Sequence, residues 1–194
     1  MVPSSVVVFD FDGTLTVRDT LPCLLRGLAR SRWHYLGAFV ACAPWLIAYK
    51  LRFLEGGKAK QRLVSRFVKG MSCAEFEARC KAIAREHREA LLRNDVLEQL
   101  EAHVARGAAV YVCSANFDTW VEVFLAPTAV PVVATGLEQR DGVLTGRFST
   151  PNCNGEEKWE RMKALIADGT LEVYGDSKGD AALMSHAQVT HIIK

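Results

Sequence analysis

Short runs of apolar and β-branched residues recur along the chain and predict strands that are buried on both faces. They occur at 6–9, 109–113, 130–134, 171–174 and 189–193. Stretches with helical patterns, for example at 95–106 and 156–167, separate most of these runs. Alternating strands and helices favour an α/β fold built on a parallel sheet, so we expect ligands to bind at the carboxyl ends of its strands.

Two segments interrupt this alternation. Residues 137–148 hold Asp141-Gly142 between flanks of alternating polarity, which predicts a β-hairpin. Residues 17–93 have helical patterns throughout and are too long for a simple crossover, so they predict a helical cap inserted after the first strand. We therefore expect a core domain made of residues 1–16 and 94–194, and a cap made of residues 17–93.

The composition is that of a folded protein with a substantial core. Of the 194 residues, 49% are hydrophobic and 24% are charged, which excludes a disordered chain and a disulfide-stapled miniprotein. The net charge of +2 lacks the basic excess typical of nucleic-acid-binding domains, so we expect no nucleic-acid partner. The six cysteines form no C-x-x-C pair and the first residues lack a basic leader, so we expect reduced thiols in a cytoplasmic protein.

Positive charge is concentrated in the predicted cap. Residues 26–69 contain ten Lys or Arg and a single acidic residue, Glu55. Within them, 33–49 has no Asp, Glu, Lys or Arg, and it is slightly shorter than the ~20 residues that cross a bilayer. Two interpretations stay open: a buried pair of cap helices, or a surface that contacts an anionic membrane or closes over a lipid tail.

Acidic residues follow two of the predicted strands at the point where each strand ends. Asp10 and Asp12 come directly after the first strand, and Asp176 and Asp180 follow the strand at 171–174. Parallel strands bring their carboxyl ends to one edge, so we expect these carboxylates to converge and repel one another. A hard cation with oxygen ligands relieves that repulsion, and Mg²⁺ suits a site that also holds a phosphate. The sequence therefore predicts a Mg²⁺ site at this edge.

Neutral groups that suit an anion are expected at the same edge. Ser114 follows the strand at 109–113 and offers a hydroxyl donor, with Ala115 beside it. Gly13, in the loop after the first strand, allows the backbone to approach an anion closely. Together with the acidic residues, these positions predict a site for a phosphate group.

One lysine is well placed to join this site. Lys158 lies in the first turn of the helix predicted at 156–167, so its ammonium can reach the acidic edge. Lys163 lies further along that helix and Lys178 lies inside the acidic loop, so both are less suitable. Each part has a common structural role when taken alone, but the order strand-acid, strand-serine, lysine, strand-acid is specific.

Taken together, these parts resemble a known family. Residues 6–16 (VVVFDFDGTLT), the strand end at 112–114, Lys158, and residues 174–180 (YGDSKGD) resemble the four motifs of the haloacid dehalogenase (HAD) superfamily. The helical insertion is similar to the cap of its phosphoserine-phosphatase-like branch. The resemblance implies a Rossmann-like core with a helical cap and the activity of a Mg²⁺-dependent phosphatase.

The resemblance also implies catalytic roles. Asp10 would be the nucleophile that forms an aspartyl-phosphate. Asp12 would be the acid that protonates the leaving oxygen, and then the base that activates water. Lys158 would neutralise the charge that develops on the phosphoryl group. The phosphate would be bound by Gly13, Ser114, Ala115 and Lys158.

The metal-binding set follows from the same resemblance. Asp10, the backbone carbonyl of Asp12, and Asp176 would hold Mg²⁺, and Asp180 would orient Asp176 or a bound water. An Asp at position 12 favours rapid hydrolysis of the phosphoenzyme, which makes a phosphatase the leading hypothesis. A phosphomutase or phosphotransferase shares this residue, and a catalytically silent binding protein of the same fold is a further alternative.

The sequence leaves the substrate open between a phosphorylated small molecule and a phospholipid head group. Asp19 is the one residue that could replace the Glu with which phosphoserine phosphatase reads its substrate amine, and the last motif is GDSKGD rather than GDGAND. A phosphoserine phosphatase-like enzyme is thus one alternative. The apolar and basic cap is similar to that of HAD-type phosphatidylglycerophosphate phosphatases, which implies a lipid phosphatase that contacts the inner membrane face through residues 26–69.

Overall fold

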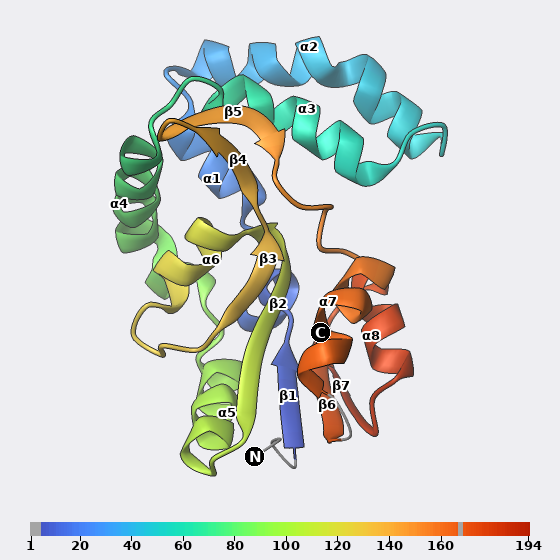
Figure 1. The fold of residues 1–194 in the computed structure, drawn as a ribbon. Coiled ribbons are helices and arrows are strands. Elements are labelled where there is room, and N and C mark those ends of the chain that lie inside the picture. The colour runs from blue at the N-terminus through green and yellow to red at the C-terminus, as the bar shows by residue number, and fades with distance from the viewer. Residues whose placement is uncertain (1–4, 167–168) are drawn as a thin grey trace.

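A five-stranded parallel sheet forms the centre of the protein (Figure 1). The computed structural model describes residues 5–166 and 169–194. The strand order is β3-β2-β1-β6-β7, which confirms the predicted α/β fold with its Rossmann-like core. The strands are β1 (Ser5–Phe9), β2 (Ala109–Phe117), β3 (Val132–Thr135), β6 (Thr170–Gly175) and β7 (Val189–Ile192).

Helices cover both faces of the sheet because its central strand is apolar on both faces. Val7 and Phe9 of β1 join the buried cluster that includes α5 and α6, whereas Val6 and Val8 join the cluster that includes α7 and α8. This is the period of two expected for side chains along a strand. The helices are α5 (Asn94–Ala105), α6 (Asp118–Leu125), α7 (Glu156–Ile166) and α8 (Ala181–Ser185).

The predicted strand and helix boundaries are close to the observed ones. The strand predicted at 109–113 continues to Phe117, because residues from Val112 to Phe117 pair with β3. The strand predicted at 130–134 begins two residues later, at Val132, just after a proline that has no N–H to donate. The helix predicted at 156–167 is described as far as Ile166, and Ala167 lies outside the described residues.

The segment 17–93 is helical, as predicted, and its helices cover the carboxyl edge of the sheet (Figure 1). The side-chain oxygens of Ser31 and Ser72 accept hydrogen bonds from the N–H groups of His34 and Glu75, which fixes the starts of α2 and α4. Helix α4 packs against α6 of the core. The cap helices are α1 (Leu21–Leu28), α2 (Arg32–Lys50), α3 (Gly56–Val68) and α4 (Cys73–Leu91).

The two places where the chain passes between the core and these helices lie side by side. Thr16 and Leu92 form an isolated antiparallel bridge. The N–H of Val17 donates to the carbonyl oxygen of Leu91 at 2.8 Å. We propose that the boundary between core and cap runs through this bridge.

The predicted hairpin is present, and it packs on a cap helix. Strands β4 (Leu137–Arg140) and β5 (Val143–Phe148) are joined by Asp141 and Gly142, which have φ values of 50° and 75° as a tight hairpin turn requires. The N–H of Phe148 donates to Oε1 of Gln61 on α3 at 2.9 Å. The hairpin belongs to the stretch 94–194 that the sequence assigns to the core, and we propose that it be counted with the cap.

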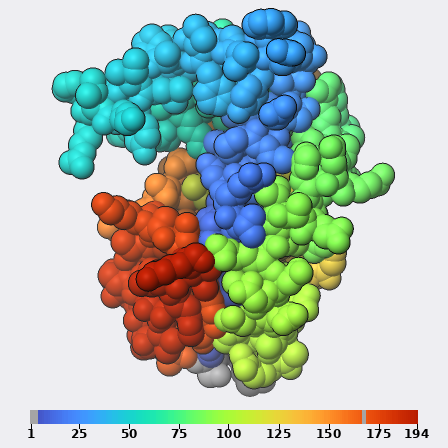
Figure 2. Space-filling view, turned by 180° about the vertical axis from the view of Figure 1, so that it is seen from behind, coloured from blue at the N-terminus to red at the C-terminus, as the bar shows by residue number. Residues whose placement is uncertain are grey.

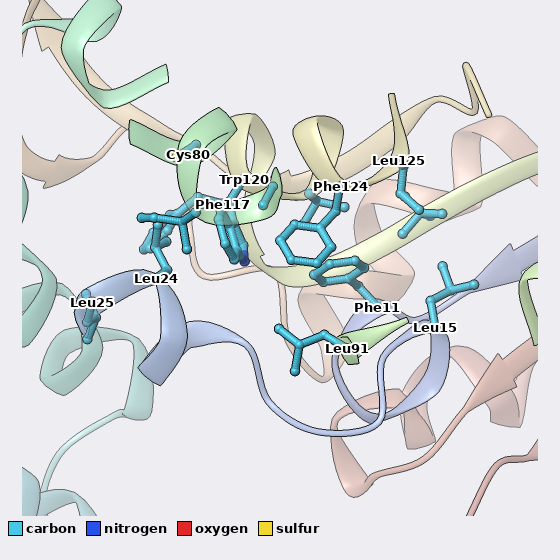
Figure 3. Close-up of a cluster of buried hydrophobic side chains, with 14 of the residues drawn as sticks. Phe11, Leu15, Leu24, Leu25, Cys80, Leu91, Phe117, Trp120, Phe124 and Leu125 are labelled. Carbon is cyan, nitrogen blue, oxygen red and sulfur yellow. The ribbon is translucent and has the colours of Figure 1, made fainter. Parts of the chain in front are cut away.

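A buried apolar cluster joins the cap to the core (Figure 3). Phe11 and Leu15, in the turn after β1, contribute to it together with Trp120 and Phe124 of α6 and Leu24 of α1. The rings of Trp120 and Phe124 meet edge to face at a centroid distance of 4.6 Å. The turn that carries Asp12 and Gly13 is therefore fixed from both domains.

Candidate active site

Three carboxylates converge at the carboxyl edge of the sheet. Asp10 follows β1 and Asp176 follows β6, while Asp180 ends a short 3₁₀ turn, Lys178–Asp180. One carboxylate oxygen from each lies within 4.8 Å of the other two, and Asp10 and Asp180 are buried. An all-oxygen set of this kind fits a hard divalent cation such as Mg²⁺.

Lys158 joins two of these carboxylates. Its Nζ donates to Oδ1 of Asp10 and to Oδ1 of Asp180, both at 2.5 Å, and the lysine is buried. Burial opposes the charge on this ammonium, but the two carboxylates outweigh burial and raise the pKa of Lys158. By contrast, Lys163 is exposed and pairs with Glu160. Lys178 is also exposed, so Lys158 is the lysine that reaches the acidic edge.

Burial has the largest effect on the pKa of Asp10. Burial raises the pKa of Asp10 to about 7, although the adjacent Lys158 ammonium opposes the rise. Asp10 has a cationic partner, Lys158, and its pKa is still raised. A metal ion bound next to Asp10 would favour the ionised carboxylate further.

Asp12 is held apart from the three converging carboxylates by its own network. Its Oδ1 accepts from both the N–H and the hydroxyl of Thr20, each at 2.7 Å. Its Oδ2 accepts from Nδ2 of Asn116 at 3.0 Å. The indole Nε1 of Trp120 donates to the Thr20 hydroxyl at 2.8 Å, which fixes that hydroxyl's orientation. Burial raises the pKa of Asp12, and the hydrogen bonds from Thr20 and Asn116 oppose that rise.

Gly13 occupies a position that strongly favours glycine. Its φ is 83°, and a Cβ at this position would lie 2.2 Å from Oδ2 of Asp176. Its N–H donates to the hydroxyl of Thr16 at 3.2 Å. The bare Cα of Gly13 thus makes room for a carboxylate, and this close approach brings the turn after β1 against the end of β6.

Ser114 and Ala115 lie beside the carboxylates at the end of β2. Oγ of Ser114 accepts from the N–H of Asn116 at 3.0 Å, which leaves its own hydroxyl proton free to donate. The carbonyl oxygen of Ala115 accepts from Nζ of Lys60 at 2.6 Å and from the Thr135 hydroxyl at 2.8 Å. Ser114 therefore offers a donor to an anion, and Ala115 anchors a cap lysine.

A cleft of about 480 Å³ lies between the cap and the core. Figure 2 shows the end of α2 and the start of α3 overhanging the C-terminal part of the core, with a hollow below them. The floor is polar, with Asp10, Asp12, Ser114 and Lys158, and Asp19 also lines the cleft. The cap contributes an apolar wall together with the amine of Lys60, and the residues of this wall are Leu21, Leu46, Tyr49, Ala59 and Leu63.

Three residues that shape this site carry no signal that a sequence pattern reveals. Thr20 and Asn116 hold Asp12, and no motif of the chain marks Thr20. Lys60 counted as one of ten basic residues, but the pattern could not tell that it points inward. Burial lowers the pKa of Lys60 to about 8, and its Nζ lies 5.1 Å from the ring centroid of Phe117.

Fold and site together define a capped α/β protein with an acidic cleft at the carboxyl edge of its parallel sheet. A model of the haloacid dehalogenase-like hydrolases matches residues 7–185, so the chain belongs to this family. It is also 31% identical over 186 residues to Protein CicA of Caulobacter vibrioides (strain NA1000 / CB15N), a match that covers 94% of this chain and 82% of that protein.

Solved structures with the same fold include several phosphatases. A protein of unknown function from Bordetella pertussis Tohama I superposes with a TM-score of 0.80 at 22% identity, covering 97% of this chain and 89% of that one. A substrate-bound phosphoserine phosphatase superposes with a TM-score of 0.66 at 18% identity, covering 95% and 83%. A probable phosphoserine phosphatase from Vibrio cholerae gives 0.68 at 18%, covering 97% and 57%. At these identities the likeness concerns the fold.

Proposed function

We propose that the protein is a Mg²⁺-dependent phosphatase that hydrolyses a phosphomonoester through a phosphate ester of Asp10. The observation that carries this proposal is the separation of two carboxylates within one cleft. Asp10 contacts Lys158 and lies next to Asp176, whereas Asp12 is held by Thr20 and Asn116. Two buried carboxylates in different environments suit two different roles, one as nucleophile and one as acid and base.

In the first half-reaction a carboxylate oxygen of Asp10 attacks phosphorus. The bond from phosphorus to the substrate oxygen breaks, and Asp12 gives its proton to that oxygen. Burial raises the pKa of Asp12, which favours the protonated form that this step requires. The product alcohol leaves, and Asp10 carries the phosphoryl group as an acyl phosphate.

In the second half-reaction a water molecule attacks the same phosphorus atom. Asp12, now ionised, accepts a proton from this water, and the bond between phosphorus and Asp10 breaks. Inorganic phosphate leaves, and both aspartates return to their starting states. Lys158 and the Ser114 hydroxyl stabilise the charge on the phosphoryl oxygens in both steps.

The residues present fit a Mg²⁺ ion. Asp10, Asp176 and the backbone carbonyl of Asp12 would hold it, with Asp180 as a supporting carboxylate close to the first two. When bound, Mg²⁺ neutralises phosphoryl oxygens and the acidic cluster. Asp180 also keeps Lys158 aimed at Asp10, because this carboxylate contacts the same ammonium.

Hydrolysis of an aryl phosphate tests this proposal. We expect activity that requires Mg²⁺, is lost with EDTA, and falls by on the order of 10³-fold or more in the Asp10→Asn variant. Lys158→Met should also lose activity, while Lys163→Met, on an exposed position of the same helix, should keep it. Activity that survives both EDTA and Asp10→Asn would contradict the proposal.

A phospholipid head group is a second candidate substrate. The observation that favours it is the apolar wall of the cleft, where Leu46 and Tyr49 of α2 face the same cavity as the catalytic residues. A lipid phosphatase predicts faster turnover of a phosphatidylglycerol phosphate in mixed micelles than of its deacylated head group. Equal turnover of both would favour a phosphorylated small molecule instead.

A further inference from the structure

Helix α2 is apolar on two opposite faces, but the rest of the protein covers only one of them among the described residues. Between positions 33 and 49 it carries no Asp, Glu, Lys or Arg. Ala38 and Cys42 are buried on the side that packs against α3. A helix that is apolar all round is normally buried all round. The remaining face of α2 therefore lacks a partner within the described residues.

The uncovered face forms a continuous stripe at helical spacing. Trp33, Leu36, Val40 and Ile47 are exposed to 72%, 51%, 75% and 58%, and they recur three, four and seven residues apart. Beyond the helix, the exposed fraction of Phe53 is 83%. We call these residues, together with the exposed Leu51, the outer stripe. From Trp33 to Ile47 it runs for about 21 Å along α2 at 1.5 Å per residue.

Basic residues mark both ends of the outer stripe. Arg30 and Arg32 precede Trp33 at one end, and Lys50 and Arg52 alternate with Leu51 and Phe53 at the other. All four are exposed, and none takes part in a salt bridge among residues 5–166 and 169–194. Their charges are therefore available to an external partner.

The position of α2 in the fold makes the outer stripe accessible. Figures 1 and 2 place α2 along the outer edge of the cap, away from the sheet. Its inward side chains Leu46 and Tyr49 line the active-site cleft. A flat surface that contacts the outer stripe would therefore touch the same helix, α2, whose other side lines the cleft.

We propose that the outer stripe docks the protein on an anionic lipid bilayer, with α2 lying in the plane of the interface. Apolar side chains of an interfacial helix insert at the boundary between head groups and acyl chains, and basic residues beside them contact anionic head groups. Trp33, near one end of the stripe, is of a type enriched at membrane–water interfaces. Phe53, near the other end, is of a type found on the apolar face of interfacial helices. In the described part of the chain, no helix is long and apolar enough to cross a membrane.

A second copy of the chain suits this surface less well than a bilayer. Because both ends of α2 are basic, pairing two outer stripes in either direction places Arg30 and Arg32 of one copy near basic residues of the other. Glu55 is the sole acidic residue between positions 26 and 69, so it cannot neutralise both ends. An anionic membrane neutralises both ends at once.

Co-sedimentation with vesicles tests the proposal independently of catalysis. We expect the full chain to bind vesicles of phosphatidylglycerol and phosphatidylcholine at low salt, to bind pure phosphatidylcholine vesicles more weakly, and to dissociate as salt rises. The Asp10→Asn variant should bind like the unaltered chain. Binding and hydrolysis are thus separate measurements, and the failure of one is distinguishable from the failure of the other.

Matched substitutions locate the docking surface. Val40→Glu, in the centre of the outer stripe, should weaken binding by about tenfold or more while leaving hydrolysis of a soluble aryl phosphate unchanged. Val104→Glu makes the same change at an exposed position of α5 and should leave binding within about twofold of the unaltered chain. No binding to anionic vesicles at low salt, or equal binding by both variants, would overturn the proposal. So would a stable dimer without lipid that Val40→Glu dissociates, which would assign the stripe to contact between copies.

Discussion

Nζ of Lys60, on cap helix α3, lies 2.6 Å from the carbonyl oxygen of Ala115, on core strand β2. This hydrogen bond joins the cap helix to the core sheet, and it places the Lys60 amine in the cleft that Asp10 and Asp12 also line. One carbonyl uses one of the three ammonium protons, so the others are free to donate to a substrate. We therefore propose that Lys60 couples the position of the cap to substrate binding.

The charge of Lys60 predicts a pH dependence of substrate binding. Burial lowers its pKa to about 8, so the ammonium is charged below that value and neutral above it. If Lys60 contacts the substrate, KM for an anionic substrate rises as pH increases through about 8. Steady-state kinetics between pH 6 and 10 should show this increase in KM.

Substitutions at position 60 isolate this effect. Lys60→Met should raise KM about tenfold at pH 7, a loss of ~1.4 kcal/mol, and remove the rise near pH 8. Lys60→Arg should keep a low KM above pH 8, because a guanidinium does not deprotonate there. Lys58→Met, at an exposed position two residues away, is the control. An unchanged KM in Lys60→Met would show that Lys60 only ties the cap to the core.

Thr20 should act through Asp12. Thr20→Val removes the hydroxyl that donates to Asp12 Oδ1 and should lower kcat about tenfold with little change in KM. The hydrogen bond from the Thr20 hydroxyl lowers the pKa of Asp12, so its loss raises that pKa and moves the acid limb of the kcat profile to higher pH. Thr20→Ser should restore both. A lower kcat with an unshifted acid limb would indicate a structural role alone.

Gly13→Ala should impair the metal site rather than the whole fold. A Cβ at position 13 would displace the carboxylate of Asp176, so we expect weaker Mg²⁺ activation in a titration of activity against Mg²⁺. Gly142 in the hairpin provides a matched control, because its φ is also positive, at 75°, and the space around it is open. Gly142→Ala should cost some stability to heat with unchanged Mg²⁺ activation. Equal Mg²⁺ activation in both variants would contradict the tight contact between Gly13 and Asp176.

The sequence predicted the sheet, the hairpin and the edge at which the acidic residues meet. Strand runs such as 6–9 are local patterns, and parallel pairing brings Asp10, Asp176 and Asp180 together wherever the strands end at one edge. The placement of Lys158 in the first turn of α7 followed in the same way from local helix periodicity.

Other features depended on contacts between segments that are distant in sequence. Thr20, which directly precedes α1, hydrogen-bonds to Asp12 after β1 and to Trp120 on α6, and no local pattern reveals these contacts. The inward direction of Lys60 and the packing of the hairpin on α3 depend on how the cap sits over the sheet. For 33–49, apolarity left a buried pair of helices and a membrane-contacting surface open. The structure has the single helix α2 there, with one face covered and the other exposed.

The central claim is that Asp10 carries the phosphoryl group, and trapping this intermediate tests it most directly. The Asp12→Ala variant with an aryl phosphate should accumulate the intermediate, because an aryl leaving group needs no acid whereas the second step needs the base. Acid quenching, borohydride reduction and peptide mapping should then find homoserine at position 10, in a reaction that depends on substrate and Mg²⁺. Homoserine at a different position would contradict the proposed mechanism. So would an Asp12→Ala variant that turns over as fast as the unaltered chain and yields no homoserine at position 10.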